Sequence, residues 1–210
     1  MTKRGRAESE HHWVGADPGG LNRFGIALLS PRGRYRSTVV SCADEALEYV
    51  ARNCEGPPKG GGIDAPLWWS SGPTSVRMAD KWIRSEFGIS SGTVQAGNSL
   101  RGAALIQGAM LVVRLRERFP GIEITETHPK ALLRGARTSY ARFCKQSGLA
   151  AGANAAAETD DQQDAVISAI WARDVFEGRW SRDLTKERNP SEQDPSTYWL
   201  KPIHYYWPQR

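Results

Sequence analysis

The stretch Glu158-Thr-Asp-Asp-Gln-Gln-Asp-Ala-Val-Ile-Ser-Ala-Ile-Trp-Ala172 constrains the structure of this chain most strongly. It predicts the start of a helix that runs from about residue 160 to 177, with Thr159 as N-cap. Asp160 and Asp161 fall in the first turn, where the helix dipole favours negative charge. Asp164 comes directly before the apolar residues that should face the core. A carboxylate in that position costs free energy unless a cation meets it, and either an arginine or a metal ion would serve.

Composition limits the kind of protein this is. The chain has 210 residues, of which 40% are hydrophobic, enough for one compact domain with appendages. Its formal net charge of +5 favours polyanionic partners such as DNA or RNA. The three cysteines include no C-x-x-C pair, which argues for a reducing compartment and against a cysteine-ligated zinc. No secretory signal or membrane-length apolar run is present, so we expect a soluble cytoplasmic protein without membrane contact.

The segments before this helix predict an α/β fold. Three segments rich in strand-forming residues, joined by short Gly/Pro turns, predict an antiparallel meander, and two further strands follow. The predicted strands cover residues 13–17, 24–29, 35–40, 60–65 and 122–126. The predicted helices cover residues 43–52, 75–87, 100–119 and 128–133. This is the order of a ribonuclease H-like fold: a mixed five-stranded sheet flanked by helices, with a helical insertion after strand four.

The two ends of the chain differ from its middle. Residues 1–11 are polar and predict a flexible N-terminal tail, and residues 12–178 form the expected domain. Residues 179–210 form an extension rich in proline and aromatic residues. We expect its aromatic side chains to form a strap over apolar surface. A homodimer contact and a platform for stacking single-stranded nucleic acid are the alternatives.

Five acidic residues fall at comparable places in this pattern. Asp17, Asp64 and Glu126 end predicted strands, whereas Asp161 and Asp164 open the last helix. Ligand sites lie beyond the carboxyl ends of parallel strands, so we expect these acids to converge on one catalytic site. Converging carboxylates repel each other and need cations, and their hard oxygen atoms suit Mg²⁺ or Mn²⁺. We expect Asp17, Asp64 and Asp164 to ligate the metal, with Glu126 and Asp161 completing or supporting the shell.

Four other residues are candidates for substrate binding. Arg77 could hold a substrate phosphate, although its spacing from Asp80 also fits an ordinary surface ion pair. Lys130 is a second phosphate candidate. Trp68 and Trp69 could stack on bases, and core packing is the alternative for either ring.

Ordinary structural roles compete with the catalytic ones. Asp17 before Pro-Gly-Gly could simply start a turn, and Asp161 could only cap its helix. Glu126 could form an ion pair with Arg134 or His128. His128 could also assist proton transfer near neutral pH.

Five motifs occur in order along the chain: Val14-Gly-Ala-Asp17, Gly62-Ile-Asp-Ala-Pro66, Arg77-x-x-Asp80, Thr125-Glu-Thr-His-Pro129 and Asp160-Asp-x-x-Asp-Ala165. With them the chain resembles the DUF429 family of predicted nucleases over most of residues 13–175. The resemblance implies a ribonuclease H-like fold and a metal-dependent nuclease that acts on DNA or RNA. The chain departs from the family at Pro18, where members often carry a small residue, and we expect this to alter the approach of a phosphate.

Two other functions compete with a nuclease. One is a module on the same fold that binds nucleic acid or protein without catalysis. The other is a phosphotransferase of the sugar-kinase and actin-like kind, in which Asp17-Pro-Gly-Gly20 would cradle phosphates. The chain is short for the two domains that such enzymes usually need.

Overall fold

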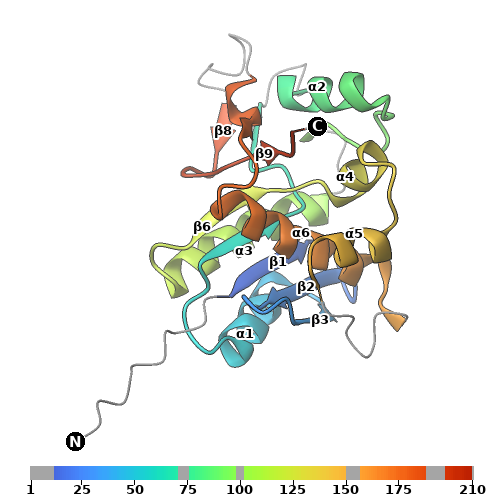
Figure 1. Cartoon of the computed structure of the whole chain (residues 1–210). Helices are drawn as coiled ribbons and strands as arrows, with labels where there is room; N and C mark the ends of the chain where they lie inside the picture. The colour runs from blue at the N-terminus through green and yellow to red at the C-terminus, as the bar shows by residue number, and fades with distance from the viewer. Residues whose placement is uncertain (1–11, 71–75, 98–101, 150–156, 188–196, 210) are drawn as a thin grey trace, which may run out of the picture.

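The central feature of the structure, a computed structural model, is a five-stranded mixed sheet in the order β3-β2-β1-β4-β6 (Figure 1). The structure describes residues 12–70, 76–97, 102–149, 157–187 and 197–209. The sheet consists of β1 (Trp13–Asp17), β2 (Phe24–Leu29), β3 (Tyr35–Val40), β4 (Gly60–Ile63) and β6 (Glu123–Glu126). Short ribbons are formed by β5 (Trp68–Ser70) with β8 (Thr197–Trp199) and by β7 (Arg182–Asp183) with β9 (Tyr206–Trp207).

Six α-helices in the described part of the chain surround the sheet. They are α1 (Ala43–Asn53), α2 (Met78–Phe87), α3 (Gly102–Arg118), α4 (Pro129–Gly135), α5 (Tyr140–Gln146) and α6 (Asp160–Phe176). A 3-10 turn, η3 (Leu184–Lys186), follows β7. None of the helices in these segments combines the length and the apolar character that crossing a bilayer requires.

Strand pairing agrees with the fold class that the sequence predicts. β1 pairs antiparallel with β2, and β2 pairs antiparallel with β3. On its other side β1 pairs parallel with β4, which pairs parallel with β6. β5, α2 and α3 form the expected insertion after β4. The arrangement is that of a ribonuclease H-like sheet, and it confirms the prediction of a mixed α/β fold.

Helix α6 lies directly on one face of the sheet because glycines on three adjacent strands leave room for its backbone. A Cβ atom at Gly15 would lie 1.9 Å from the carbonyl oxygen of Ala165. At Gly62 it would lie 2.1 Å from the Ser168 carbonyl oxygen, a separation that real Cβ atoms do not adopt. A Cβ atom at Gly25 of β2 would likewise collide with the backbone at the start of α6, because it would lie 1.9 Å from the Asp161 carbonyl oxygen. The close approach sets the height of α6 above the ends of β1 and β4.

The start of α6 is held by a capping box. The Thr159 hydroxyl accepts a hydrogen bond from the Gln162 backbone at 3.3 Å. The Gln162 side chain accepts one in return from the Thr159 backbone at 3.1 Å. The prediction of Thr159 as N-cap is therefore confirmed, and the cap fixes where the acidic first turn begins.

Helices α1 and α3 cover the opposite face of the sheet (Figure 1). Val14 of β1, Ile26 of β2 and Ile63 of β4 point to this side and are fully buried. Leu111 of α3 and Val50 of α1 complete the layer. The two faces therefore receive alternate residues of each strand, as the period of two requires.

The aromatic end of the chain packs back onto the domain. Tyr205 is fully buried and Trp207 is 2% exposed. Trp207 meets Trp171 of α6 edge-on, with ring centroids 5.2 Å apart, and the Trp171 indole N–H donates to the Tyr206 carbonyl oxygen at 3.0 Å. His204 bonds with the backbone of β6, so the outer edge of that strand is covered. The prediction of an aromatic strap holds for these residues, and the homodimer contact stays a prediction.

Candidate functional site

Asp17 and Asp64 leave neighbouring parallel strands at the same edge of the sheet. Ala16 pairs with Ile63, and the Asp64 backbone N–H donates to the Ala16 carbonyl oxygen at 2.9 Å. The side chains of Ala16 and Ile63 point away from α6, so those of Asp17 and Asp64 are directed to the α6 side.

A pocket of about 390 Å³ opens at this edge. Asp17 and Asp64 line it together with three basic side chains of α4 and its N-cap: His128, Lys130 and Arg134. Gly92, Thr93 and Gln95 of the loop after α2, together with Ala65, Pro66 and Ala104, complete its wall. We call this the carboxylate pocket.

Asp164 of α6 lies beside the pocket and contacts Lys130, one of the residues that line it. Its side chain is 6% exposed, and its Oδ2 lies 2.8 Å from the Lys130 ammonium nitrogen. The same Oδ2 is fully buried and receives no well-aligned hydrogen bond from the described residues. We regard the Lys130 contact as an ion pair because the two atoms are close without being aligned as donor and acceptor. Lys130 therefore neutralises Asp164 in the structure, and a bound ion would have to displace its ammonium.

Crowding of like charges perturbs two of these acids. Burial raises the pKa of Asp17 well above its ordinary value, and the charges of Asp64 and Asp164 raise it further. Burial and the charge of Asp64 raise the pKa of Asp164 to about 6, although Lys130 acts in the opposite direction. Burial and the close spacing of the carboxylates cause these shifts, whereas Lys130, Arg134 and His128 supply basic groups beside the three acids.

His128 lies beside Asp64. Its Nδ1 is 3.4 Å from Asp64 Oδ1. Burial alone lowers the pKa of His128, but the hydrogen bond and charge of Asp64 outweigh this effect and raise the pKa overall. Asp64 therefore favours the protonated form of the imidazole.

Asp161 lies at the margin of the carboxylate pocket and is paired with Arg23. The Arg23 Nε is 2.8 Å from Asp161 Oδ2, and a second guanidinium nitrogen donates to Oδ1 at 3.1 Å. The negative charge of Asp161 also contributes to the raised pKa of Asp17. The role of Asp161 in supporting the metal shell stays a prediction.

The sequence predicts that Glu126 helps to coordinate the metal, but the structure contradicts this prediction. Glu126 pairs in the sheet with Ile63, one residue before Asp64, and shares the face of Ile124. The next residue, Thr127, bonds to Ser168 of α6 instead. The Glu126 carboxylate therefore points away from the α6 side, and it is 1% exposed. It receives the Leu67 backbone N–H at 2.9 Å.

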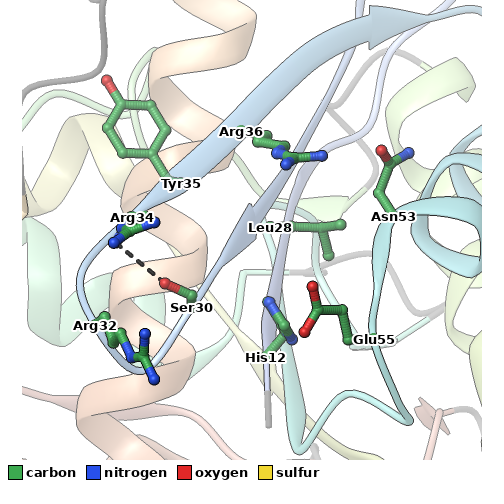
Figure 2. A pocket seen from close by; sticks show the side chains of 9 residues that line it. All are labelled: His12, Leu28, Ser30, Arg32, Arg34, Tyr35, Arg36, Asn53 and Glu55. Atoms are coloured by element: carbon green, nitrogen blue, oxygen red, sulfur yellow. Dashed lines mark hydrogen bonds between the residues drawn. The ribbon is translucent and has the colours of Figure 1, made fainter. Parts of the chain in front are cut away.

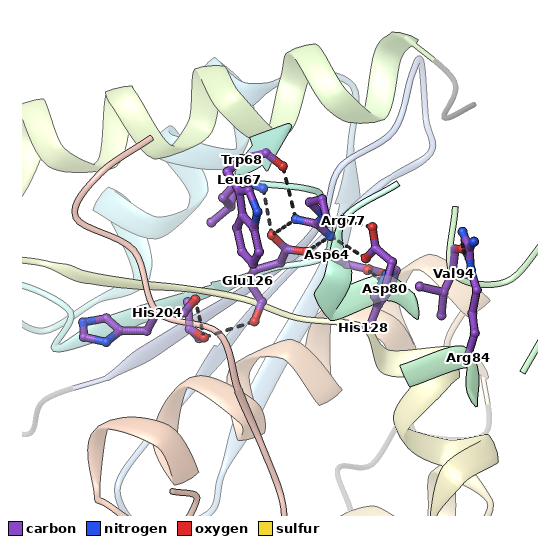
Figure 3. Close-up of polar contacts among 11 residues, drawn as sticks. Asp64, Leu67, Trp68, Arg77, Asp80, Arg84, Val94, Glu126, His128 and His204 are labelled. Atoms are coloured by element: carbon purple, nitrogen blue, oxygen red, sulfur yellow. Dashed lines mark hydrogen bonds and ion pairs between the residues drawn. The ribbon is translucent and has the colours of Figure 1, made fainter. Parts of the chain in front are cut away.

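Arg77 is likewise not free to hold a substrate phosphate. Its guanidinium is 1% exposed and donates to Glu126 at 2.6 and 2.8 Å and to Asp80 at 2.7 and 2.9 Å (Figure 3). Two carboxylates thus occupy its donors. Burial raises the pKa of Glu126 even though Arg77 acts to lower it. The three side chains form a buried network that ties the insertion to β6, in place of the surface ion pair or substrate contact considered from the sequence.

The two tryptophans also occupy structural positions. Trp68 is completely buried, and the Arg77 guanidinium carbon lies 4.2 Å from the centre of its ring. It meets Tyr205 edge-on at 5.7 Å. Trp69 is half-buried and packs near Gly97. Neither ring is among the residues that line the carboxylate pocket, and the structure favours core packing over base stacking for Trp68.

The chemistry of the donors fits a divalent cation. Asp17, Asp64 and Asp164 offer the hard carboxylate oxygens that Mg²⁺ and Mn²⁺ prefer. No group of three or more His, Cys, Asp or Glu side chains in the described segments is already spaced as a ligand set. The Lys130 ammonium contacts Asp164 and also acts on the charge of Asp17. A bound ion would take over the position that the ammonium now neutralises.

Sequence reasoning missed two basic residues at this site. Arg134 lines the carboxylate pocket and contacts the Thr93 hydroxyl. Its spacing of four from Lys130 places both on one face of α4, a signal that the sequence did contain. Arg23 follows a turn, and nothing in the sequence pattern connects it with Asp161.

Comparison of the chain with models of known families, with curated proteins and with solved structures finds no match. The resemblance to the DUF429 family therefore stays a prediction, and the site rests on its own geometry.

Proposed function

We propose that this chain is a divalent-metal-dependent nuclease that hydrolyses phosphodiester bonds of nucleic acid in the carboxylate pocket. One observation carries the proposal: Asp17, Asp64 and Asp164, far apart in sequence, act on one another's charge at the open edge of the sheet. A purely structural cluster would be expected to neutralise its acids with arginines, as the Arg77 network does. We place this activity in the cytoplasm, in line with the three free cysteines.

Each residue of the pocket has a role in this proposal. Bound Mg²⁺ or Mn²⁺ would lower the pKa of the attacking water and polarise the phosphodiester. Asp17, Asp64 and Asp164 would hold the ions. His128, whose Nδ1 lies 3.4 Å from Asp64 Oδ1, is the residue that would donate a proton to the leaving oxygen. Lys130 leaves Asp164 and contacts the substrate phosphate.

The substrate follows from the charge around the pocket. Lys130 is 57% exposed and Arg134 lies beside it on the same face of α4, so both are accessible to an incoming phosphate. The net charge of +5 also favours a polyanion. We propose DNA or RNA strands as the substrate class.

Asp17→Asn tests the assignment most simply. We expect the variant to lose Mg²⁺- or Mn²⁺-dependent cleavage of labelled DNA and RNA oligonucleotides, with a rate loss on the order of 100-fold or more. Asp44→Asn, which alters an exposed acid of α1, is the matched control and should cleave normally. Full cleavage by Asp17→Asn would remove this residue from the mechanism.

A non-catalytic nucleic-acid-binding module is the second candidate. The observation that favours it is the Lys130–Asp164 ion pair, which already neutralises one acid without a metal. Salt-sensitive binding of oligonucleotides without cleavage in any divalent ion would support this function over the nuclease.

A further inference from the structure

The segment from His128 to Leu149 accounts for the whole net charge of the chain. It contains five lysines and arginines and no aspartate or glutamate. The full chain has 28 basic and 23 acidic residues, so the two kinds are equal in number once these five are set aside. Residues 150–157, which follow the segment, contain no acidic side chain either. The five basic residues are Lys130, Arg134, Arg137, Arg142 and Lys145.

All five residues are exposed on α4, on α5 or on the link between them. Lys130 and Arg134 are four residues apart and share one face of α4. Arg142 and Lys145 lie on the outer side of α5, whereas the aromatic residues of that helix pack against the core. Arg137 lies in the link, and Figure 1 shows the two helices beside each other on one side of the molecule. We call these five residues the basic surface.

The positive charge of this surface is mostly unneutralised. Lys130 pairs with Asp164 at 2.8 Å. The side chains of Arg137, Arg142 and Lys145 form no hydrogen bond or ion pair with any residue that the structure describes. Three exposed cations within nine residues therefore lack a counter-charge in those segments, and an external anion can reach all of them.

The helix dipole accounts for only part of this arrangement. Cations in the last turn of a helix stabilise its dipole, which fits Arg134 of α4 and Lys145 of α5. Arg142 lies instead in the first turn of α5, where the dipole disfavours a positive charge. Arg137 has a φ of 49°, a left-handed conformation that glycine or asparagine adopts at lower cost. Neither arginine is therefore explained by the stability of its own element.

Protection of a strand edge does not explain the basic surface either. Three other arginines, Arg32, Arg34 and Arg36, lie on the β2–β3 hairpin, where Figure 2 shows them around a pocket with Glu55. β3 is an edge strand, and charged side chains on such strands hinder pairing with other chains. That explanation fits the hairpin. It does not apply to α4 and α5, which are helices.

We propose that the basic surface binds the sugar-phosphate backbone of a nucleic-acid strand beyond the carboxylate pocket. Lys130 and Arg134 also line that pocket, so the two binding regions are continuous. Lysine and arginine bind backbone phosphates whatever the base sequence. An anionic membrane would instead require large apolar side chains beside the cations, and the outer side of α5 adds only Ala141 and Gln146.

This inference rests on the proposed function for its choice of nucleic acid as the partner. It adds the size of the substrate: a strand of several nucleotides, because one part occupies the carboxylate pocket while its neighbouring phosphates lie along α4 and α5. Binding at the basic surface needs no metal ion, so it can be measured without cleavage.

Fluorescence anisotropy of a labelled single strand of about 20 nucleotides in EDTA tests the proposal. The triple variant Arg137→Gln, Arg142→Gln and Lys145→Gln changes none of the residues that line the carboxylate pocket. At about 0.1 M salt we expect it to bind the strand at least about tenfold more weakly. The slope of log Kd against log salt should fall by about 2, because each phosphate contact on a single strand contributes about 0.7.

Two further variants separate the position of the charges from their number and from folding. The matched control Arg52→Gln, Arg114→Gln and Arg118→Gln removes three exposed arginines of α1 and α3, which changes the net charge equally. It should bind like the wild type. Arg137→Lys with Arg142→Lys keeps the charge and should also bind within about twofold of the wild type.

Three results would overturn the proposal: unchanged binding in the triple variant, equal weakening by the α1 and α3 control, or no binding of the strand by the wild type. Vesicles that contain phosphatidylserine are the further probe. If the triple variant bound vesicles more weakly but the strand normally, the surface would belong to a membrane contact instead. Weaker binding in the triple variant, with no cleavage by the wild type in any divalent ion, would support the basic surface and contradict the nuclease.

Discussion

At the scale of single residues, burial and mutual repulsion of acidic side chains destabilise the carboxylate pocket. Asp17 has no hydrogen bond or ion pair with any residue in the described segments, and Asp164 has only Lys130 as a counter-cation. Buried acids in such surroundings favour their protonated forms. Their raised pKa values therefore link the stability of the metal-free protein to pH.

Asp164→Asn should stabilise the metal-free protein at about pH 8. A group with a folded pKa of about 6 and an ordinary value of 3.8 is destabilising when charged, so its penalty grows as pH rises through this window. Removing the charge should contribute on the order of 2 kcal/mol, or several degrees in Tm. Thermal unfolding in EDTA measures this, and the gain should vanish below about pH 4. A variant that is less stable than the wild type at pH 8 would contradict the account.

Lys130→Met should change stability and metal affinity in opposite directions. Without the ammonium, the three carboxylates repel one another in EDTA, and the Tm should fall by a few degrees. Mn²⁺ should bind several-fold more tightly in calorimetry because no internal cation competes for Asp164. Arg134→Met, which leaves the Asp164 ion pair intact, is the control. Weaker Mn²⁺ binding in Lys130→Met would show that the lysine does not compete with the ion.

The sequence could identify some of these residues and not others. Asp17, Asp64 and Asp164 were predictable because strand ends and helix starts can be located from composition and periodicity. The orientation of Glu126 was not predictable, since it depends on register, and a shift of one residue reverses the face. The burial of Arg77 was not predicted. Its spacing of three residues from Asp80 allows an ion pair both at the surface and in the core, so the spacing does not indicate which one forms.

At the scale of elements, contact between α6 and the sheet controls the site. Gly62→Ala should destabilise the protein by about 3 kcal/mol or more, because its Cβ would meet the backbone of α6. Gly61→Ala is the matched control on the same strand, where the Cβ would meet a flexible end of Ile124 at 3.3 Å and should cost much less. Urea unfolding compares the two. Equal stability of both variants would show that α6 does not rest on the glycines.

The sequence predicted the boundaries of the strands more readily than the pairing of segments that are far apart in the chain. The three strands of the meander begin and end where predicted, because Gly/Pro turns bound them sharply. β5 and β8 escaped prediction, since a ribbon formed by segments far apart in the chain leaves no local pattern. Gly62, two residues before Asp64, allows the close approach of a backbone, and α6 is that backbone.

At the scale of the whole molecule, the C-terminal aromatic residues complete the core. Trp207→Ala should cost about 3–5 kcal/mol, because the ring is buried against Trp171 and its removal leaves a cavity. Leu21→Ala, at a side chain that is 77% exposed, should have little effect and serves as control. Chemical denaturation provides the comparison. An unchanged midpoint for Trp207→Ala would mean that the strap contributes little to the fold.

The central claim is that acids from β1, β4 and α6 form one divalent-cation site. Anomalous diffraction from a crystal soaked in Mn²⁺ tests it most directly. We predict an anomalous peak bounded by the carboxylates of Asp17, Asp64 and Asp164, with the Lys130 ammonium displaced. A soaked crystal with no peak in the carboxylate pocket, and with Lys130 still paired to Asp164, would contradict it.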